Sequence, residues 1–97
     1  MKPFRWNHGK NDELKTDRGI SFEEVVLAIE AGGLLDVIRH PNSGKHPNQL
    51  VFVVALDDYV HMVPFVEETD YYFLKTVIPS RKATHDYLLR RKRDETS

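Results

Sequence analysis

The segment "GISFEEVVLAIEAGG", residues 19–33, decides the fold of this chain. Ser21 and Glu24 have the spacing of a capping box, in which a hydroxyl and a carboxylate satisfy the first backbone N–H groups of a helix. The two glycines at the end of the segment stop the helical pattern, because glycine readily adopts the left-handed conformation that follows a helix. The segment therefore predicts a helix over 22–31.

A second helix is expected just before it, in "WNHGKNDELKTDRG", residues 6–19. Asn7 is a favourable N-cap and Gly19 a favourable stop, which predicts a helix over 8–17. In the helix over 22–31, apolar residues recur at spacings of three and four and so share one face. That pattern is typical of a helix that packs on a core.

The hydrophobic period changes after the glycines. Runs rich in β-branched and aromatic residues predict four strands, over 34–40, 50–56, 59–67 and 71–78. A polar loop joins the first two strands, and "DD" at 57–58 and "EETD" at 67–70 predict tight turns, so the strands form an antiparallel meander. Pro64 lacks a ladder donor, so we expect an edge, a bulge or a break beside it.

A third helix is expected at the end of the chain. Pro79 ends the last strand, and Ser80 can cap a helix over 81–92. This order predicts the α+β class: two N-terminal helices packed on one face of a mainly antiparallel sheet of about four strands, with a C-terminal helix. Helices on both faces would contradict this arrangement. The expected core residues include Val26, Ile29, Val53 and Leu74.

Composition limits the function classes. A chain of 97 residues with 40% apolar composition predicts one domain over 1–97, of which 93–97 form a frayed tail. No apolar run reaches the roughly 20 residues that span a bilayer, so we expect no membrane association and a cytoplasmic location. The absence of cysteine excludes disulfides and thiolate chemistry. The five histidines are too scattered for a metal site, and no cofactor is expected.

The charge divides sharply along the chain. Residues 1–74 carry seven Lys or Arg against twelve Asp or Glu, a net of −5, whereas residues 75–93 carry seven against one, a net of +6. A local positive potential of this kind favours a polyanion or an acidic protein as partner. The solvated end of a helix is an equally good interpretation of the charge alone.

Two blocks of the sequence match the pattern of one protein family. The first is "FRWNHGKNDELKTDRGISFEEVVLAI", in which these residues fit the pattern: Phe4, Trp6, Lys10, Gly19, Ile20, Ser21, Phe22, Glu23 and Glu24. The second is "IPSRKAT", where Arg81, Lys82, Ala83 and Thr84 fit. The two blocks resemble the BrnT family of bacterial toxins, and the resemblance spans about residues 4–88.

This resemblance implies a RelE-like α+β fold and a ribonuclease toxin of a type II toxin–antitoxin module. It also implies a cognate antitoxin that binds DNA, a hetero-oligomer of the two proteins, and contact with operator DNA only through the antitoxin. The chain departs from the family at three places. Asp17 and Arg18 replace a Lys-His pair, "PNQLVF" at 47–52 replaces an acid–Arg start, and Thr76 replaces a basic residue.

Cleavage of RNA without a metal ion needs a base for the 2′-hydroxyl, cations for the phosphate and an acid for the leaving oxygen. Arg81 suits the phosphate because its planar fork matches two oxygens, while Lys82 and Lys75 add charge and can exchange a proton. His85 is one helical turn from Arg81 and is the acid–base candidate. A surface salt-bridge patch and a solvated histidine are the alternative interpretations. His61, in mid-strand, is expected to be packed or hydrogen-bonded.

The remaining candidates would bind RNA. Arg90, Arg91, Lys92 and Arg93 supply attraction that does not depend on sequence. Tyr71 or Tyr72 can stack on a base, although packing in the core or at an edge is the alternative, and we single out Tyr72. The rival function is a toxin-like protein that pairs with an antitoxin and assists operator binding without cleaving RNA.

Overall fold

The first helix has the caps that its sequence predicts. The computed structural model describes residues 1–39, 44 and 49–89. Helix α1, His8–Arg18, begins at Asn7, whose side chain accepts a hydrogen bond from the Lys10 backbone N–H at 2.9 Å. It ends at Gly19, which has a φ of 66° in the left-handed region. The predicted start is confirmed, and the helix runs one residue further than the predicted 17.

Helix α2 is shorter than predicted. It spans Phe22–Ala28 and begins at Ser21, whose Oγ accepts from the Glu24 backbone N–H at 3.2 Å. The chain then widens into a π-helical turn, η1, Ile29–Gly33, in place of the last predicted turn. Gly32 has a φ of 93°, and a Cβ on Gly33 would lie 2.6 Å from the backbone oxygen of Ala55 in the sheet. The two glycines thus end the helix and allow close packing on the sheet.

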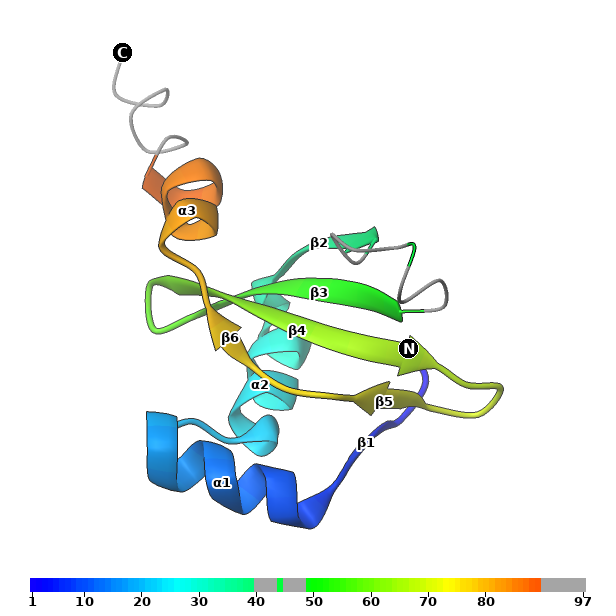
Figure 1. Cartoon of the computed structure of the whole chain (residues 1–97). Coiled ribbons are helices and arrows are strands. Elements are labelled where there is room, and N and C mark those ends of the chain that lie inside the picture. The colour runs from blue at the N-terminus through cyan, green and yellow to red at the C-terminus, as the bar shows by residue number, and fades with distance from the viewer. Residues whose placement is uncertain (40–43, 45–48, 90–97) are drawn as a thin grey trace.

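Six strands form one mixed sheet (Figure 1). The strands are β1 Phe4–Trp6, β2 Leu34–Arg39, β3 Gln49–Leu56, β4 Tyr59–Glu67, β5 Tyr72–Leu74 and β6 Ile78–Pro79. Their order is β1-β5-β4-β3-β2, and β6 pairs with β4 beyond the end of β5. β1 is parallel to β5, and every other pair among the described strands is antiparallel. The predicted set of about four strands is therefore too small, although the α+β class is correct.

Strand β1 was not predicted. It has only three residues between Pro3 and Asn7, which is too short for an alternating pattern to be recognised. It is held by pairing with β5, in a register that places Phe4, Arg5 and Trp6 opposite 72–74. Because it is parallel to its neighbour, it makes the sheet mixed.

The β3–β4 hairpin is built as predicted. Its two turn residues, Asp57 and Asp58, have φ values of 55° and 60°. Positive φ at both central positions is the geometry of a type I′ turn, whose twist matches that of the flanking strands. This hairpin fixes the centre of the sheet.

The strand predicted over 71–78 is split in two. Lys75 donates its backbone N–H to the Pro64 carbonyl at 2.8 Å, which places the proline ring nitrogen on the same side of β4. Since that nitrogen carries no hydrogen, β4 has no donor there. The ladder stops after β5 and resumes only at β6, which confirms the expected break beside Pro64.

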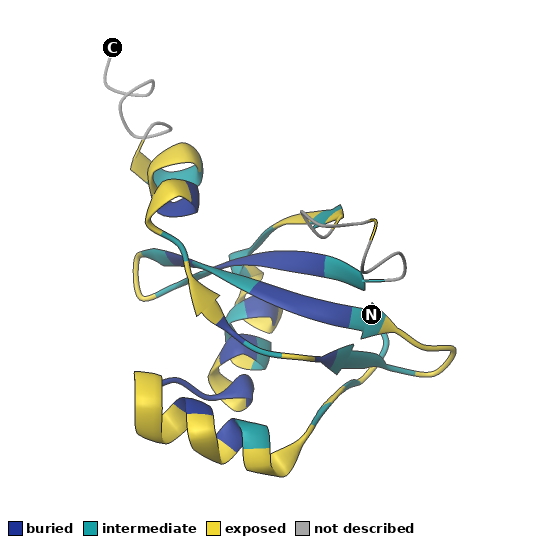
Figure 2. Cartoon of the chain, viewed as in Figure 1, coloured by how far each residue is buried: buried dark blue, intermediate teal, exposed yellow. Residues whose placement is uncertain are grey.

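One face of the sheet, the α1/α2 face, carries the larger core. Figure 2 shows buried stretches in the central strands and in the two N-terminal helices. The cluster contains Leu14, Ile20, Phe22, Val25, Ile29, Phe52, Val54, Val63, Phe65, Leu74 and Val77. Val26, Phe4 and Trp6 pack against it. The predictions for Ile29 and Leu74 are confirmed, whereas Val26 is only partly buried at the edge of this core.

The C-terminal helix packs on the opposite face, the α3 face. Helix α3, Arg81–Thr84, continues as the π-helical turn η2, His85–Leu89, and positions 90–92 of the predicted helix lie outside the described residues. Val53, Val60 and Ala83 form the core there. The prediction that helices pack on one face only was therefore wrong. The side chains of β3 alternate between the two faces of the sheet, so both faces carry apolar residues that a helix can cover. None of the helices in the described segments is long and apolar enough to cross a membrane.

Candidate functional site

The segment 80–84, the α3 junction, is fastened to the middle of the sheet. Ser80 caps α3 by accepting from the Ala83 backbone N–H at 3.1 Å. Thr84 Oγ1 donates to the Ser80 carbonyl at 2.7 Å and accepts from the Val60 backbone N–H at 2.8 Å. Both Ala83 and Thr84 are buried. Three of the five residues in "SRKAT" therefore serve the fold.

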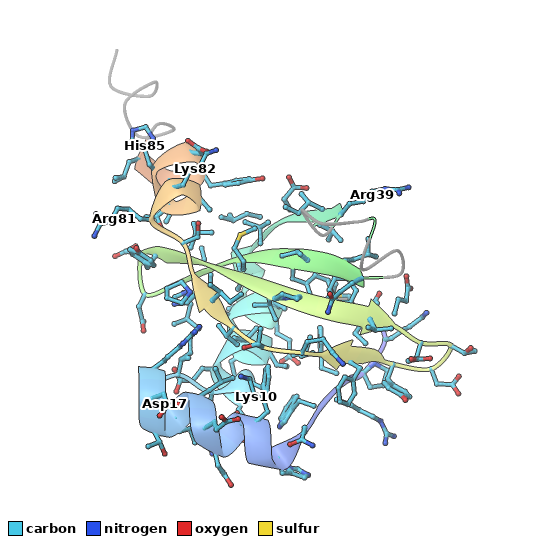
Figure 3. All side chains as sticks on the ribbon, viewed as in Figure 1. Lys10, Asp17, Arg39, Arg81, Lys82 and His85 are labelled. Atoms are coloured by element: carbon cyan, nitrogen blue, oxygen red, sulfur yellow. The ribbon has the colours of Figure 1, made fainter. Side chains whose placement is uncertain are left out.

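The other two, Arg81 and Lys82, are exposed. Figure 3 shows both side chains projecting from α3 into solvent. Within the described residues, ion pairs form only between Lys2 and Glu67 and between His85 and Asp86. Arg81 and Lys82 have no carboxylate partner there. Two unneutralised cations on an anchored junction are suited to bind an anion such as a phosphate.

His85 is the next exposed residue of the same helical segment. Its Nδ1 lies 3.5 Å from Asp86 Oδ1, and 58% of its side chain is accessible. The carboxylate can orient the ring. The structure thus brings Arg81, Lys82 and His85 together within little more than one helical turn.

Lys75 is not part of that group. Its backbone lies opposite Pro64, whereas Ser80 donates to the Val60 carbonyl at 2.9 Å. Four residues along β4 separate these positions, roughly 13 Å at the usual rise of a strand. Lys75 lies on the α3 face, since its neighbour Leu74 belongs to the core of the other face. The four residues predicted as one catalytic group therefore occupy two places on the same face.

The ring of Tyr72 is packed rather than displayed. It contacts Phe52 and Phe65 edge-on, with ring centroids 5.4 Å apart in each case, and Lys2 lies over it at 5.7 Å. Alternation along the chain sends Tyr71 and Phe73 to the α3 face instead. Arg5 lies over the Tyr71 ring at 5.1 Å, and Lys75 Nζ lies 5.3 Å from the Phe73 centroid. These positions favour Tyr71 over Tyr72 for stacking on a base.

Arg5 is a candidate that the sequence interpretation missed. The signal was present, because Phe4 and Trp6 point into the core and the residue between them must then face the other way. Missing β1 as a strand hid this alternation. The predicted RNA-binding residues Arg90, Arg91, Lys92 and Arg93 lie outside the described residues.

The residues that carry the N-terminal resemblance have structural roles. Ser21 and Gly19 cap helices, and Trp6 stacks on Phe22 with centroids 5.6 Å apart. Asn11, which was not singled out, is almost fully buried. Its Oδ1 accepts from the Phe22 backbone N–H at 2.8 Å.

The Asn11 side chain also connects the two N-terminal helices. Its Nδ2 donates to Glu23 Oε1 at 2.5 Å. This hydrogen bond is the main cause that lowers the pKa of the Glu23 carboxyl. Asn11 therefore fixes α1 against the start of α2.

His61 is half-buried at the edge of a cleft of about 240 Å³ that also contains Arg18 and Tyr59. Within the described residues its Nδ1 has no hydrogen-bond partner, and its ring contacts the Tyr59 ring edge-on. Burial lowers the pKa of this histidine, and the Tyr59 backbone and Asp57 offset part of that effect. The expectation that His61 is packed is correct.

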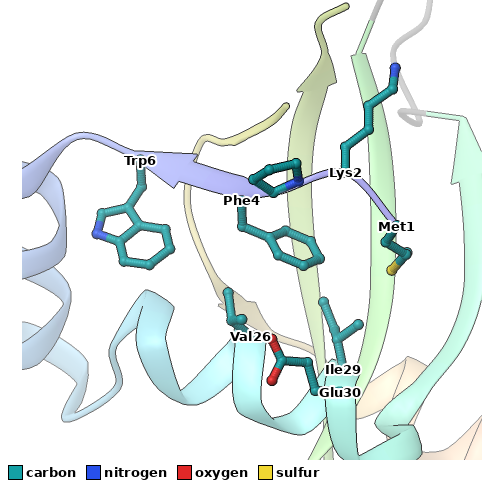
Figure 4. A pocket seen from close by; sticks show the side chains of 8 residues that line it. Met1, Lys2, Phe4, Trp6, Val26, Ile29 and Glu30 are labelled. Carbon is teal, nitrogen blue, oxygen red and sulfur yellow. The ribbon is translucent and has the colours of Figure 1, made fainter. Parts of the chain in front are cut away.

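Another groove lies on the α1/α2 side. Figure 4 shows Phe4 and Trp6 pointing from β1 toward Val26 and Ile29. The groove encloses about 530 Å³, and Lys2 and Glu30 are its charged residues. It lacks a grouping of acid, base and cation suited to RNA cleavage. Across the described ranges, no three His, Asp or Glu side chains are placed to hold a metal ion.

Comparison of the chain with protein-family models, with curated proteins and with solved structures finds no match. The two sequence blocks and the geometry of the α3 face are therefore the features that bear on function.

Proposed function

We propose that this chain is the toxin of a bacterial type II toxin–antitoxin module, a BrnT-like protein with a RelE-like arrangement. It cleaves RNA without a metal ion and thereby inhibits translation. The observation that carries the proposal is the α3 junction, where capping and burial hold three residues of "SRKAT" while Arg81 and Lys82 remain exposed without carboxylate partners in the described ranges.

The proposed reaction uses the neighbouring 2′-hydroxyl of the RNA as nucleophile. Its oxygen forms a bond to phosphorus, the bond from phosphorus to the 5′-oxygen breaks, and a cyclic phosphate and a free 5′-hydroxyl result. Arg81 and Lys82 neutralise the charge that builds on the phosphate oxygens. His85, oriented by Asp86, exchanges the proton between the attacking and leaving oxygens.

A cognate antitoxin is the proposed protein partner. It would bind operator DNA, and the toxin would contact that DNA only through it. A complex of this kind is expected to bury on the order of 800 Å² on each partner. Co-expression with the adjacent gene should give one co-purifying complex, and two separate peaks in size-exclusion chromatography would contradict this part of the proposal.

The activity is tested with purified protein and RNA in the presence of a chelator. Cleavage is expected to continue with the chelator and to fall about 10²-fold or more in Arg81→Ala at saturating RNA, by analogy with other preorganised transition-state donors. Arg39→Ala is the matched control, because Arg39 is an exposed arginine on a different part of the sheet, as Figure 3 shows. Equal activity in the two variants would remove Arg81 from the site.

One observation favours a second candidate function. Lys75 lies about four residues along β4 from the α3 junction. The phosphate site at the junction therefore has two lysine or arginine residues, Arg81 and Lys82, instead of the predicted three. A toxin-like protein that only pairs with its antitoxin and assists operator binding does not need these cations to lie closer together. Intact RNA together with tight antitoxin binding would establish this candidate instead.

A further inference from the structure

The α3 face carries a second group of cations and aromatic rings away from the α3 junction. It consists of Arg5, Tyr71, Phe73 and Lys75, the cation–aromatic patch. Arg5 lies over Tyr71 at 5.1 Å and Lys75 over Phe73 at 5.3 Å. The parallel register of β1 and β5 places Arg5 directly opposite Phe73. The two pairs are therefore neighbours on one surface.

The patch is accessible. Arg5 and Lys75 are exposed, and Tyr71 and Phe73 are only half-buried. The apolar contacts of α3 and η2 on this face are with residues of β2, β3 and β4. In the described structure, part of the surface of each ring is therefore accessible to a ligand.

The two cations of the patch form no ion pairs within the described ranges. Among the described strands, the carboxylate on this face is Asp36, which accepts from the Tyr87 hydroxyl at 2.9 Å and from the Val37 backbone N–H at 2.8 Å.

Two further acids, Glu68 and Asp70, lie in the turn beside Tyr71, where the Glu68 backbone N–H donates to the Tyr71 carbonyl at 2.8 Å. Neither carboxylate forms an ion pair with Arg5 or Lys75 in the described ranges. Both cations therefore remain available to a ligand.

The other face offers an internal contrast. Lys2 also lies near an aromatic ring, that of Tyr72, but its Nζ is paired with Glu67 at 2.9 Å. The Tyr72 ring is packed against Phe52 and Phe65. On the α1/α2 face, Lys2 and the Tyr72 ring are thus both engaged by other residues of the protein. The two cation–aromatic pairs of the patch remain available to a ligand.

We propose that the patch is a subsite for single-stranded RNA, a few nucleotides from the α3 junction along β4. This inference rests on the proposed function. Unpaired bases stack on the accessible parts of the two rings and on the guanidinium plane of Arg5, while Arg5 and Lys75 attract the adjacent phosphates. A duplex keeps its bases stacked inside, so the patch selects single strands over duplexes.

The probe is a fluorescent single-stranded 2′-O-methyl oligonucleotide of about 12 nucleotides, within the usual site sizes. It cannot be cleaved because its 2′-oxygen is blocked. Binding by the full chain is measured by anisotropy at several salt concentrations. Arg5→Ala and Tyr71→Leu are each expected to weaken binding about tenfold, since a stacked base contributes substantially to affinity.

Salt separates the two contributions. Arg5→Ala should lower the slope of log affinity against log salt by about 0.7 for each phosphate that the variant no longer binds, whereas Tyr71→Leu should leave the slope unchanged. Lys2→Ala is the matched control and should bind as the wild type does. A duplex of the same length should bind more weakly than the single strand.

The outcomes separate this inference from the proposed function. If the wild type binds the probe through the patch but cleaves no RNA, the subsite stands and the nuclease assignment fails. If the wild type cleaves RNA and both variants bind the probe and cleave with unchanged KM, the subsite is overturned. It is also overturned if the variants lose binding to a poly-glutamate peptide and not to RNA, since the surface then serves an acidic protein.

Discussion

The two faces of the sheet have different uses for the same kinds of residue. On the α1/α2 face, aromatic rings fill the core, and Lys2, beside the Tyr72 ring, is paired with Glu67. On the α3 face, a short helical segment covers part of the sheet, and cations and rings remain accessible beside it. The first face stabilises the fold, and the second is the face on which we place RNA.

The residues of the two sequence blocks differ in the same way, since some stabilise the fold and others remain exposed. In the N-terminal block, Trp6, Ser21 and Phe22 serve packing and capping. In the C-terminal block, Arg81 and Lys82 are left over after Ser80, Ala83 and Thr84 have been used by the fold. A residue that the fold does not need is the better candidate for chemistry.

The largest expected effect is on stability, at Phe22. Its side chain is fully buried and stacked against Trp6. Phe22→Ala should lower the free energy of unfolding by about 3–5 kcal/mol, because a large cavity remains in the core. Phe73→Ala, at a half-buried ring of the α3 face, is the control and should lower it by less. Urea denaturation measures both, and equal losses would show that the two faces are equally structural.

A smaller effect is expected at the α3 junction. Thr84→Val keeps the volume of the side chain but removes the hydroxyl that bonds the Val60 N–H and the Ser80 carbonyl. The unpaired N–H should cost about 1–3 kcal/mol of stability. Because α3 then loses its anchor, RNA cleavage by the folded protein should also fall.

Thr84→Ser is the matched control, since it retains the hydroxyl. It should restore both stability and cleavage toward the wild type. If Thr84→Val loses stability but cleaves at the wild-type rate, the anchoring of Arg81 and Lys82 is not part of the site.

Much of the fold follows from local sequence signals. Asn7, Ser21 and Gly19 predicted helix limits because caps act within one turn, and the Asp57-Asp58 turn predicted a hairpin. The pairing of β1 with β5 could not be predicted in this way. β1 exists only through this pairing, which joins residues 68 positions apart, and a strand of three residues has no recognisable period of its own.

The candidate site was predicted in part for the same reason. Arg81, Lys82 and His85 are close in sequence and stay close on a helix. Lys75 was grouped with them because it is only six residues from Arg81, but the intervening chain is extended and separates them. Arg5 joins Tyr71 only through the sheet, so no local pattern brought the two together.

The chain beyond Leu89 provides the next prediction. A truncation after Leu89 removes Arg90, Arg91, Lys92 and Arg93, which we expect to supply attraction that does not depend on sequence. Affinity for single-stranded RNA should fall, and the slope of log affinity against log salt should drop by about 0.7 for each phosphate that these cations neutralise in the full chain. Cleavage at saturating RNA should be unchanged, which distinguishes this variant from Arg81→Ala. A reduced rate at saturation would place these residues in the site.

The smallest expected effect concerns His61, a half-buried histidine on the α1/α2 face. His61 has a pKa below its ordinary value of 6.5, chiefly because burial disfavours the charged ring; the Tyr59 backbone and Asp57 act in the opposite direction. Between the lowered pKa and 6.5 the unfolded chain binds more protons than the folded one, so stability rises with pH in that range. The contribution is complete above 6.5 and is lost as the pH falls through the folded pKa.

His61→Phe should therefore flatten the pH dependence of the unfolding free energy below 6.5. Measurements at about pH 8, where the wild-type ring is neutral in both states, give the baseline for the packing change alone. The Nδ1 atom of His61 has no partner in the described structure, so removing it should not cost a hydrogen bond. A variant that keeps the wild-type slope below pH 6.5 would show that the burial of His61 does not set its titration.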